Sequence, residues 1–217
     1  MSEPIFNRDV LRAGMGISRR ASAPISKAIL LATGKRNLPL WRMATMGYDG
    51  YVSTIRGLTH DALIVRDPED GELKVGDALM SDGCVLTPLD SWERGCRDDG
   101  DRVCVWVPKG WTEISGIAAS DYWDLHVKGR KYDKVAIARL LAKSVCGDWL
   151  SGKVGLMSHF YCTEGVQASF ERAGLYPYYP NKNATPGTTY RRLMDKRLEI
   201  VAGALTEYGR KFAVDLT

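Results

Sequence analysis

The chain has 217 residues, of which 45% are hydrophobic and 26% charged, and it contains no apolar run long enough to span a bilayer. Its 30 basic and 26 acidic side chains leave a net charge of +4 and a pI near 8.8, and they are spread along the whole chain. This composition excludes a disordered chain and an integral membrane protein. It also argues against a specific nucleic-acid partner, which normally requires a concentrated basic face.

The cysteines and the first residues indicate a compartment. Five cysteines, an odd number without a C-x-x-C pair, suggest neither a disulfide framework nor a zinc knuckle, so a reducing compartment is expected. The first nine residues lack the basic-then-apolar shape of a secretory signal. We therefore expect a protein made for the cytoplasm, or one delivered by a phage particle or a secretion system. The length fits one domain, and the oligomeric state stays open.

The first quarter of the chain predicts a strand, a helix and a loop. A short strand entered through a glycine turn is expected within 8–20, and a helix within 22–34, where Pro24 stands in the first turn. Residues 35–58 are polar, aromatic and irregular. They predict a long loop that could line a cleft or act as a lid.

The next segments predict an antiparallel sheet. Residues 59–65 and 72–79 flank a turn and form a hairpin. A third short strand at 85–92 leads into a helical piece, and 102–107 is apolar on both faces, which is typical of an interior strand. The rest of the chain predicts mainly helices, at 108–157 and 158–174, then an aromatic loop at 175–181, and a helix with a closing strand over 185–201 and 205–212.

A cysteine at a helix start is the strongest candidate for chemistry. Val166, Phe170 and Ala173 recur at helical spacing and Gly174 stands where a helix often stops, which puts Cys162 in the first turn. The N–H groups and partial positive charge of a helix start favour a thiolate, so a nucleophile is one interpretation. A small side chain buried under the helix is the other.

A cysteine nucleophile needs a base to take its proton, and usually a third polar group to orient that base. The chain offers three histidines, His60, His126 and His159. The residue pattern alone does not choose among them.

Several short motifs follow one another in an order that is typical of a known family. They are His60-Asp61-Ala62-Leu63-Ile64-Val65, Asp77-Ala78-Leu79, Gly83-Cys84-Val85-Leu86-Thr87-Pro88-Leu89, Gly129-Arg130-Lys131-Tyr132-Asp133 and Phe160-Tyr161-Cys162-Thr163-Glu164. Together they resemble the circularly permuted papain-like hydrolases, the YiiX-like and lecithin:retinol acyltransferase-like branch of the NlpC/P60 superfamily.

The resemblance implies a fold. It would be an α+β papain-like domain of permuted order covering 1–217, with an antiparallel sheet or small barrel packed against helices. The segment 35–58 would then be a lid or insertion, and 109–157 a helical insertion.

The resemblance also implies residue roles. Cys162 would attack a carbonyl carbon, His60 would take and return the proton, and Asp77 would orient the imidazole. Glu72 on the same strand is the alternative third residue, because a slip of register would change which carboxylate faces His60. One departure is Asp61, where the family usually has a small apolar residue, and this puts the pairing around His60 in doubt.

The implied reaction is hydrolysis of an amide through an acyl-enzyme, without a metal or an organic cofactor. A peptide or peptidoglycan-type amide is the favoured substrate. The alternatives are a lipid acyl hydrolase or acyltransferase of the same fold, and a non-catalytic binding or structural module. Backbone N–H groups at the helix start would meet the oxyanion, and Tyr161 and His159 are further candidates for contact with substrate.

Overall fold

The computed structural model describes residues 5, 7–21, 23–34, 36, 38–99, 101–139, 159–178 and 184–203. In chain order its elements are η1 (Arg8–Val10), β1 (Gly16–Arg20), α1 (Pro24–Thr33), η2 (Leu40–Arg42), α2 (Met43–Ser53), β2 (His60–Arg66), β3 (Leu73–Leu79), β4 (Gly83–Pro88), α3 (Leu89–Asp98), β5 (Arg102–Pro108), α4 (Glu113–Tyr122), the π-helical turn η3 (Trp123–Val127), β6 (Lys131–Tyr132), β7 (His159–Phe160), α6 (Cys162–Arg172), α7 (Pro186–Met194) and β8 (Leu198–Gly203). Residues 134–139 are also helical.

One antiparallel sheet organises the molecule. Its six strands run in the order β4-β3-β2-β1-β5-β8, and every neighbouring pair is antiparallel. The predicted hairpin is β2 and β3, and the apolar strand β5 is interior, paired with β1 and β8. A short parallel pair, β6 with β7, lies outside this sheet. The expected α+β class with an antiparallel sheet packed against helices is confirmed.

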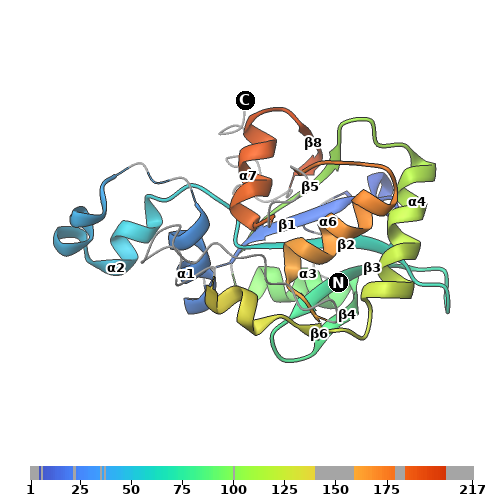
Figure 1. Ribbon diagram of the computed structural model, residues 1–217, viewed down its shortest axis with the longest axis horizontal. Coiled ribbons are helices and arrows are strands. Elements are labelled where there is room, and N and C mark those ends of the chain that lie inside the picture. The colour runs from blue at the N-terminus through green and yellow to red at the C-terminus, as the bar shows by residue number, and fades with distance from the viewer. Residues whose placement is uncertain are drawn as a thin grey trace.

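The two faces of the sheet bury separate cores. Alternation along β2 turns Leu63 and Val65 to one face, where they join the buried side chains of α6, and Ala62 and Ile64 to the other, where Trp92 of α3 covers them. Figure 1 shows α6 on one side of the sheet, with α3 on the opposite side. The start of α6 therefore lies over the strands that carry the candidate base and carboxylate.

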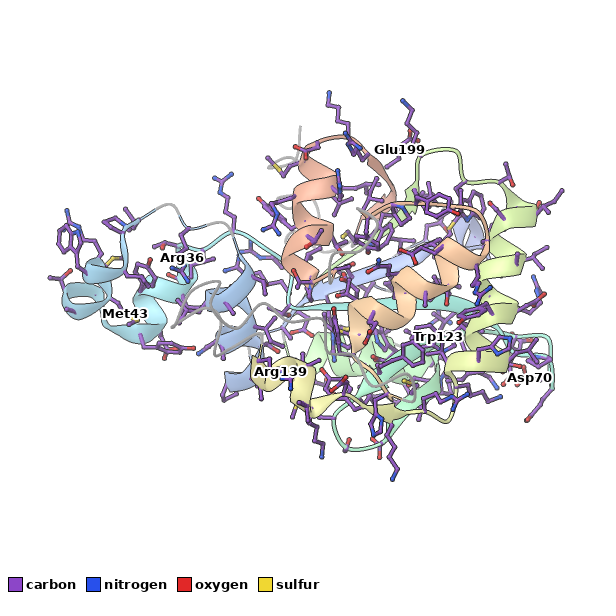
Figure 2. The ribbon with its side chains drawn as sticks, viewed as in Figure 1. Arg36, Met43, Asp70, Trp123, Arg139 and Glu199 are labelled. Carbon is purple, nitrogen blue, oxygen red and sulfur yellow. The ribbon has the colours of Figure 1, made fainter. Side chains whose placement is uncertain are left out.

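Glycines allow an indole to fit tightly between α6 and the sheet. Trp123 of η3 is fully buried, and it is labelled in Figure 2. A Cβ on Gly76 of β3 would lie 2.5 Å from Trp123 Nε1, and one on Gly165 of α6 would lie 2.8 Å from the ring. Both positions therefore exclude a larger side chain, and the Trp123 ring fixes the separation between α6 and β3.

The prediction of an irregular loop at 35–58 is wrong. The described part of this segment forms η2 and α2, and the backbone of α2 departs from helical geometry only at Gly47, whose φ is +72°. Tyr51, Val52 and Ile55 bury themselves against Leu30 of α1 in a small core of their own. Packing against α1 thus stabilises a helix whose glycines and weak periodicity hid it in the sequence. Figure 1 shows α1 and α2 together at one side of the sheet.

The C-terminal prediction is partly wrong in its boundaries. The closing strand β8 begins at Leu198, seven residues earlier than the strip at 205–212, which lies outside the described residues. The turn between α7 and β8 contains Lys196 in the left-handed region, with φ of +54°. This short turn reverses the chain onto β5, and no sequence pattern marked it.

The helix expected over 108–157 is divided into α4, η3 and 134–139, and residues 140–158 lie outside the described part.

Candidate active site

His60 and Asp77 face each other across the β2–β3 hairpin. The register that pairs Leu63 with Gly76 puts Asp77 opposite Ala62, two residues from His60 and on the same face. His60 Nε2 lies 2.5 Å from Asp77 Oδ1, and the other carboxylate oxygen accepts a hydrogen bond of 3.1 Å from Trp92 Nε1. Asp77 is only 1% exposed. The carboxylate is therefore held on two sides.

In the His60–Asp77 pair, each group stabilises the charged form of the other. Burial alone would lower the pKa of His60, but the negative charges of Asp77 and Cys162, and hydrogen bonds to both, raise it to about 10. Burial alone would raise the pKa of Asp77, but the charge and hydrogen bond of His60, and then the charge of Arg19, lower it. At neutral pH the pair is an imidazolium beside a carboxylate.

Cys162 is the first residue of α6 and follows the N-cap residue Tyr161. The first helical hydrogen bond runs from the N–H of Gly165 to the carbonyl of Tyr161, at 3.2 Å, so the N–H groups of the first turn have no partner within the helix. Because Nε2 of His60 contacts Asp77, Nδ1 is the nitrogen left for the Cys162 side chain, whose charge and hydrogen bond act on His60. The thiol, the imidazole and the carboxylate thus form one series, in which His60 lies between Cys162 and Asp77.

Glu72, the alternative carboxylate, takes no part in this series. It is exposed before β3, and its N–H donates to Asp70 Oδ1 at 2.9 Å. The register places it at the far end of the hairpin from His60. Asp77 is the carboxylate that contacts the imidazole.

The other candidates from the sequence lie around the helix start. The hydroxyl of Tyr161 donates to the carbonyl of Ala184 at 2.6 Å, which commits its only hydrogen. His159 is half-buried in β7 and lines a surface pocket with Tyr132 and Asp133 of the neighbouring strand and turn. Tyr161 therefore acts in packing, whereas His159 lies at a surface that a ligand can reach.

Glu164 caps the start of α6. Its carboxylate accepts the backbone N–H of Tyr161. Burial, and to a smaller extent the charge of Asp133, raise the pKa of Glu164 to about 7 against the effect of that hydrogen bond. One carboxylate oxygen of each residue, Glu164 Oε2 and Asp133 Oδ2, is buried without a hydrogen-bond partner among the described residues.

Sequence reasoning missed a buried network centred on Asp61. Its carboxylate accepts hydrogen bonds from Ser18 at 2.5 Å, Thr163 at 2.6 Å and Thr189 at 2.8 Å, so it links β1, β2, α6 and α7. Asp61 turns away from His60 because neighbouring residues of a strand face opposite sides. The unusual residue after His60 therefore leaves the His60–Asp77 pair undisturbed. No short motif joins these four positions, which only the packing of the helices brings together.

Trp92 was also missed as a partner of the site. It lies on α3, and Cys96 one turn later shares its buried face. This apolar spacing could have placed Trp92 under the sheet. It could not have shown that the indole N–H reaches Asp77.

The described part of the chain contains neither a candidate metal site nor a membrane-spanning helix. No group of three or more His, Cys, Asp and Glu side chains is placed to hold a metal ion there. Nor does that part contain a helix with the length and apolar character needed to cross a membrane. Its four cysteines, Cys84, Cys96, Cys104 and Cys162, are free and buried.

Comparison with known proteins finds a similarity of structure. No protein-family model matches the sequence, and neither does any curated protein. The chain is similar to the crystal structure of metalloprotein yiiX (DUF1105) from Escherichia coli O157:H7, with a TM-score of 0.47 and 16% sequence identity, over 86% of this chain and 81% of that chain.

Proposed function

We propose that the protein is a thiol hydrolase that cleaves an amide bond of a peptide or peptidoglycan-type substrate through an acyl-enzyme. The observation that carries this proposal is the position of His60, which contacts Asp77 through Nε2 and interacts with Cys162 at the start of α6. A nucleophile, a base and an orienting carboxylate are the three parts that such a reaction needs.

The first half of the reaction forms a thioester. The Cys162 thiolate attacks the carbonyl carbon, and the oxyanion accepts hydrogen bonds from the N–H groups at the start of α6. When the tetrahedral intermediate collapses, the C–N bond breaks and the His60 imidazolium gives its proton to the leaving amine. Cys162 is then acylated and His60 is neutral.

The second half releases the acid. His60 takes a proton from a water molecule, which attacks the thioester carbonyl. The C–S bond breaks, the carboxylic acid leaves, and the thiolate and imidazolium are restored. Asp77 holds the ring throughout, so that Nδ1 stays directed at the sulfur. Because the raised pKa of His60 keeps the imidazolium present at neutral pH, activity should fall as the pH rises through about 10.

Alkylation of Cys162 tests the proposed pair. Iodoacetamide labelling at neutral pH, read by mass spectrometry, should modify Cys162 faster than the other cysteines, and His60→Ala should abolish this difference. Cys84 and Cys96 are internal controls, because burial, as the largest cause, raises the pKa of each to about 12. Labelling of Cys162 that is as slow as that of Cys84 and Cys96, and that does not respond to His60→Ala, contradicts the proposal and favours a non-catalytic module.

A substrate panel then tests the type of bond. Peptide amides and peptidoglycan fragments should be cleaved by the wild type and by Cys84→Ala, but not by Cys162→Ala. Ester-bearing lipid micelles form the third arm of the panel. Cleavage of the esters alone would replace the amide assignment with the lipid acyl alternative.

A further inference from the structure

The net positive charge of the chain comes from one part of it, in which acidic residues are nearly absent. Residues 24–58, here called the α1–α2 lobe, contain five basic side chains and one acidic, which gives +4. The remaining residues hold 25 basic (30 less 5) and 25 acidic (26 less 1) side chains, which cancel. The basic residues of the lobe are Lys27, Lys35, Arg36, Arg42 and Arg56, and its one acid is Asp49, which pairs with Lys27. The lobe therefore carries the whole net charge of the protein.

The same lobe exposes large apolar side chains close together in sequence. Leu40 is 46% exposed, Trp41 62%, Met46 41% and Tyr48 42%, and all four lie within η2 and the first half of α2. The guanidinium of Arg42 lies 4.5 Å from the centre of the Trp41 ring. Figure 2 labels Arg36 and Met43 on this lobe, at one side of the molecule and away from Trp123 in its main body.

The lobe does not need these exposed side chains for its own fold. Its core is made by Leu30, Tyr51, Val52 and Ile55, each at most 4% exposed. The Tyr51 hydroxyl also donates to the carbonyl of Leu38 at 2.8 Å, which ties α2 to the segment before η2. Leu40, Trp41, Met46 and Tyr48 are thus surplus to the packing, and their exposure costs free energy unless a partner covers them.

A second exposed apolar surface shows what distinguishes the lobe. On α4 and η3, Ile114 is 82% exposed and Leu125 73%. The acidic residues Glu113, Asp121 and Asp124 lie in the same segment, 113–127, which holds no Lys or Arg. Glu113 pairs with Arg12 and Asp124 with Lys128, so the α4 side has no excess of positive charge to attract an anionic surface, whereas the lobe has one.

We propose that the α1–α2 lobe is a docking surface for an anionic lipid bilayer. Tryptophan, tyrosine and leucine side chains favour the boundary between headgroups and acyl chains, and each nearby arginine adds attraction to acidic headgroups. Trp41 and Leu40 enter that boundary, while Arg36 and Arg42 face the phosphates. The combination of exposed aromatic and aliphatic side chains with a net positive charge favours a lipid surface over a soluble acidic partner.

Vesicle co-sedimentation of the full chain tests this surface. Phosphatidylcholine vesicles that contain phosphatidylglycerol should bind the protein, and pure phosphatidylcholine vesicles should bind it much more weakly. Leu40→Ser with Trp41→Ser should reduce the partition coefficient about tenfold or more. Arg36→Gln with Arg42→Gln should reduce it about thirtyfold.

Three controls separate docking from other effects. Ile114→Ser with Leu125→Ser removes as many exposed apolar side chains from the acidic α4 side and should leave binding unchanged. Cys162→Ala should bind like the wild type, since docking does not depend on the proposed hydrolysis. Circular dichroism of each lobe variant checks that it stays folded.

Several results would overturn the proposal. They are equal binding to both kinds of vesicle, equal loss in the α4 and lobe variants, and no vesicle binding by a protein that instead retains single-stranded DNA or an acidic polypeptide through Arg36 and Arg42. The last result would assign the lobe to a different class of partner.

Discussion

Asp77 and Asp61 are buried to the same degree on adjacent strands, yet their environments differ completely. Asp77 is 1% exposed and Asp61 is not exposed at all. Asp77 faces a histidine that carries a positive charge, and this lowers its pKa in spite of burial. Asp61 receives only hydroxyl hydrogen bonds from its partners in the described structure, and burial, the largest effect, raises its pKa. A cation beside a buried carboxylate thus decides the direction in which its pKa is shifted.

This difference in environment separates a carboxylate of the candidate active site from one that stabilises the fold. Asp77 belongs to the candidate active site, where a permanent negative charge can hold an imidazolium. Asp61 joins Ser18 of β1, Thr163 of α6 and Thr189 of α7. Because Thr163 follows Cys162, this network fixes the start of α6 against the strand that begins with His60. Two outer hydrogen bonds extend it, from Trp106 to Ser18 at 2.7 Å and between Tyr178 and Thr189 at 3.0 Å.

The largest effect is expected from removing the carboxylate of the charged pair. Asp77→Ala leaves a buried imidazolium without its partner and should lower the free energy of unfolding by about 3 to 5 kcal/mol. Urea denaturation measures this change. Asp70→Ala, at an exposed carboxylate of the same hairpin, is the matched control and should change stability far less. Equal losses in both variants would show that the His60 contact contributes nothing.

A slightly smaller loss is expected from removing the carboxylate of Asp61. Asp61→Ala leaves three buried hydroxyl groups without their acceptor and should cost about 3 kcal/mol in urea denaturation. Asp61→Asn keeps one oxygen acceptor for these hydroxyl groups, so it should cost much less. If the two substitutions are equally destabilising, the acceptor function assigned to Asp61 is wrong.

The pH dependence of stability should have opposite signs at the two aspartates. The pKa of Asp77 is lowered from 3.8, so its contribution is present above about pH 4 and is lost as the pH falls. The pKa of Asp61 is raised from 3.8, so its contribution is full below that pH and is lost as the pH rises. Each difference between wild type and the Asn variant can change by up to about 1.4 kcal/mol per pH unit.

Urea denaturation from pH 3 to 6 for the wild type, Asp77→Asn and Asp61→Asn measures both differences below the pH range in which the raised pKa of His60 changes stability. The advantage of the wild type over Asp77→Asn should grow toward neutral pH, and that over Asp61→Asn should shrink. Slopes of the same sign would show that the two pKa values are shifted in the same direction, which contradicts the contrast between them.

The smallest effects are expected from the two indoles that donate to these groups. Trp92→Phe removes a hydrogen bond to the charged Asp77 and should cost about 2 kcal/mol. Trp106→Phe removes one to the neutral hydroxyl of Ser18 and should cost about 1 kcal/mol from the hydrogen bond. Each Phe also loses some packing, so the order of the two losses is the result to compare. A larger loss at Trp106 would contradict the assignment of the charge to Asp77.

Local patterns in the sequence were enough for the elements that carry the candidate site. Alternating residues around a polar turn predicted β2 and β3, and helical spacing that ends at Gly174 put Cys162 at the start of α6. Strand alternation and helix ends depend on residues close together in the chain, which is why one sequence can indicate them. The choice of His60 came from the motif resemblance, because spacing alone left three histidines open. The catalytic roles stay predictions.

Packing decided what those patterns left open. The hairpin register brings Asp77 rather than Glu72 to His60, and helix α2 exists because Tyr51 and Val52 bury against α1. Asp61 finds its hydroxyl partners on elements up to 128 residues away along the chain. The sequence by itself determined the strands, the helix start and their order, since these follow from short-range periodicity and capping. Only the tertiary structure decided which polar groups meet in the interior, because a buried carboxylate takes its partners from whichever elements pack around it.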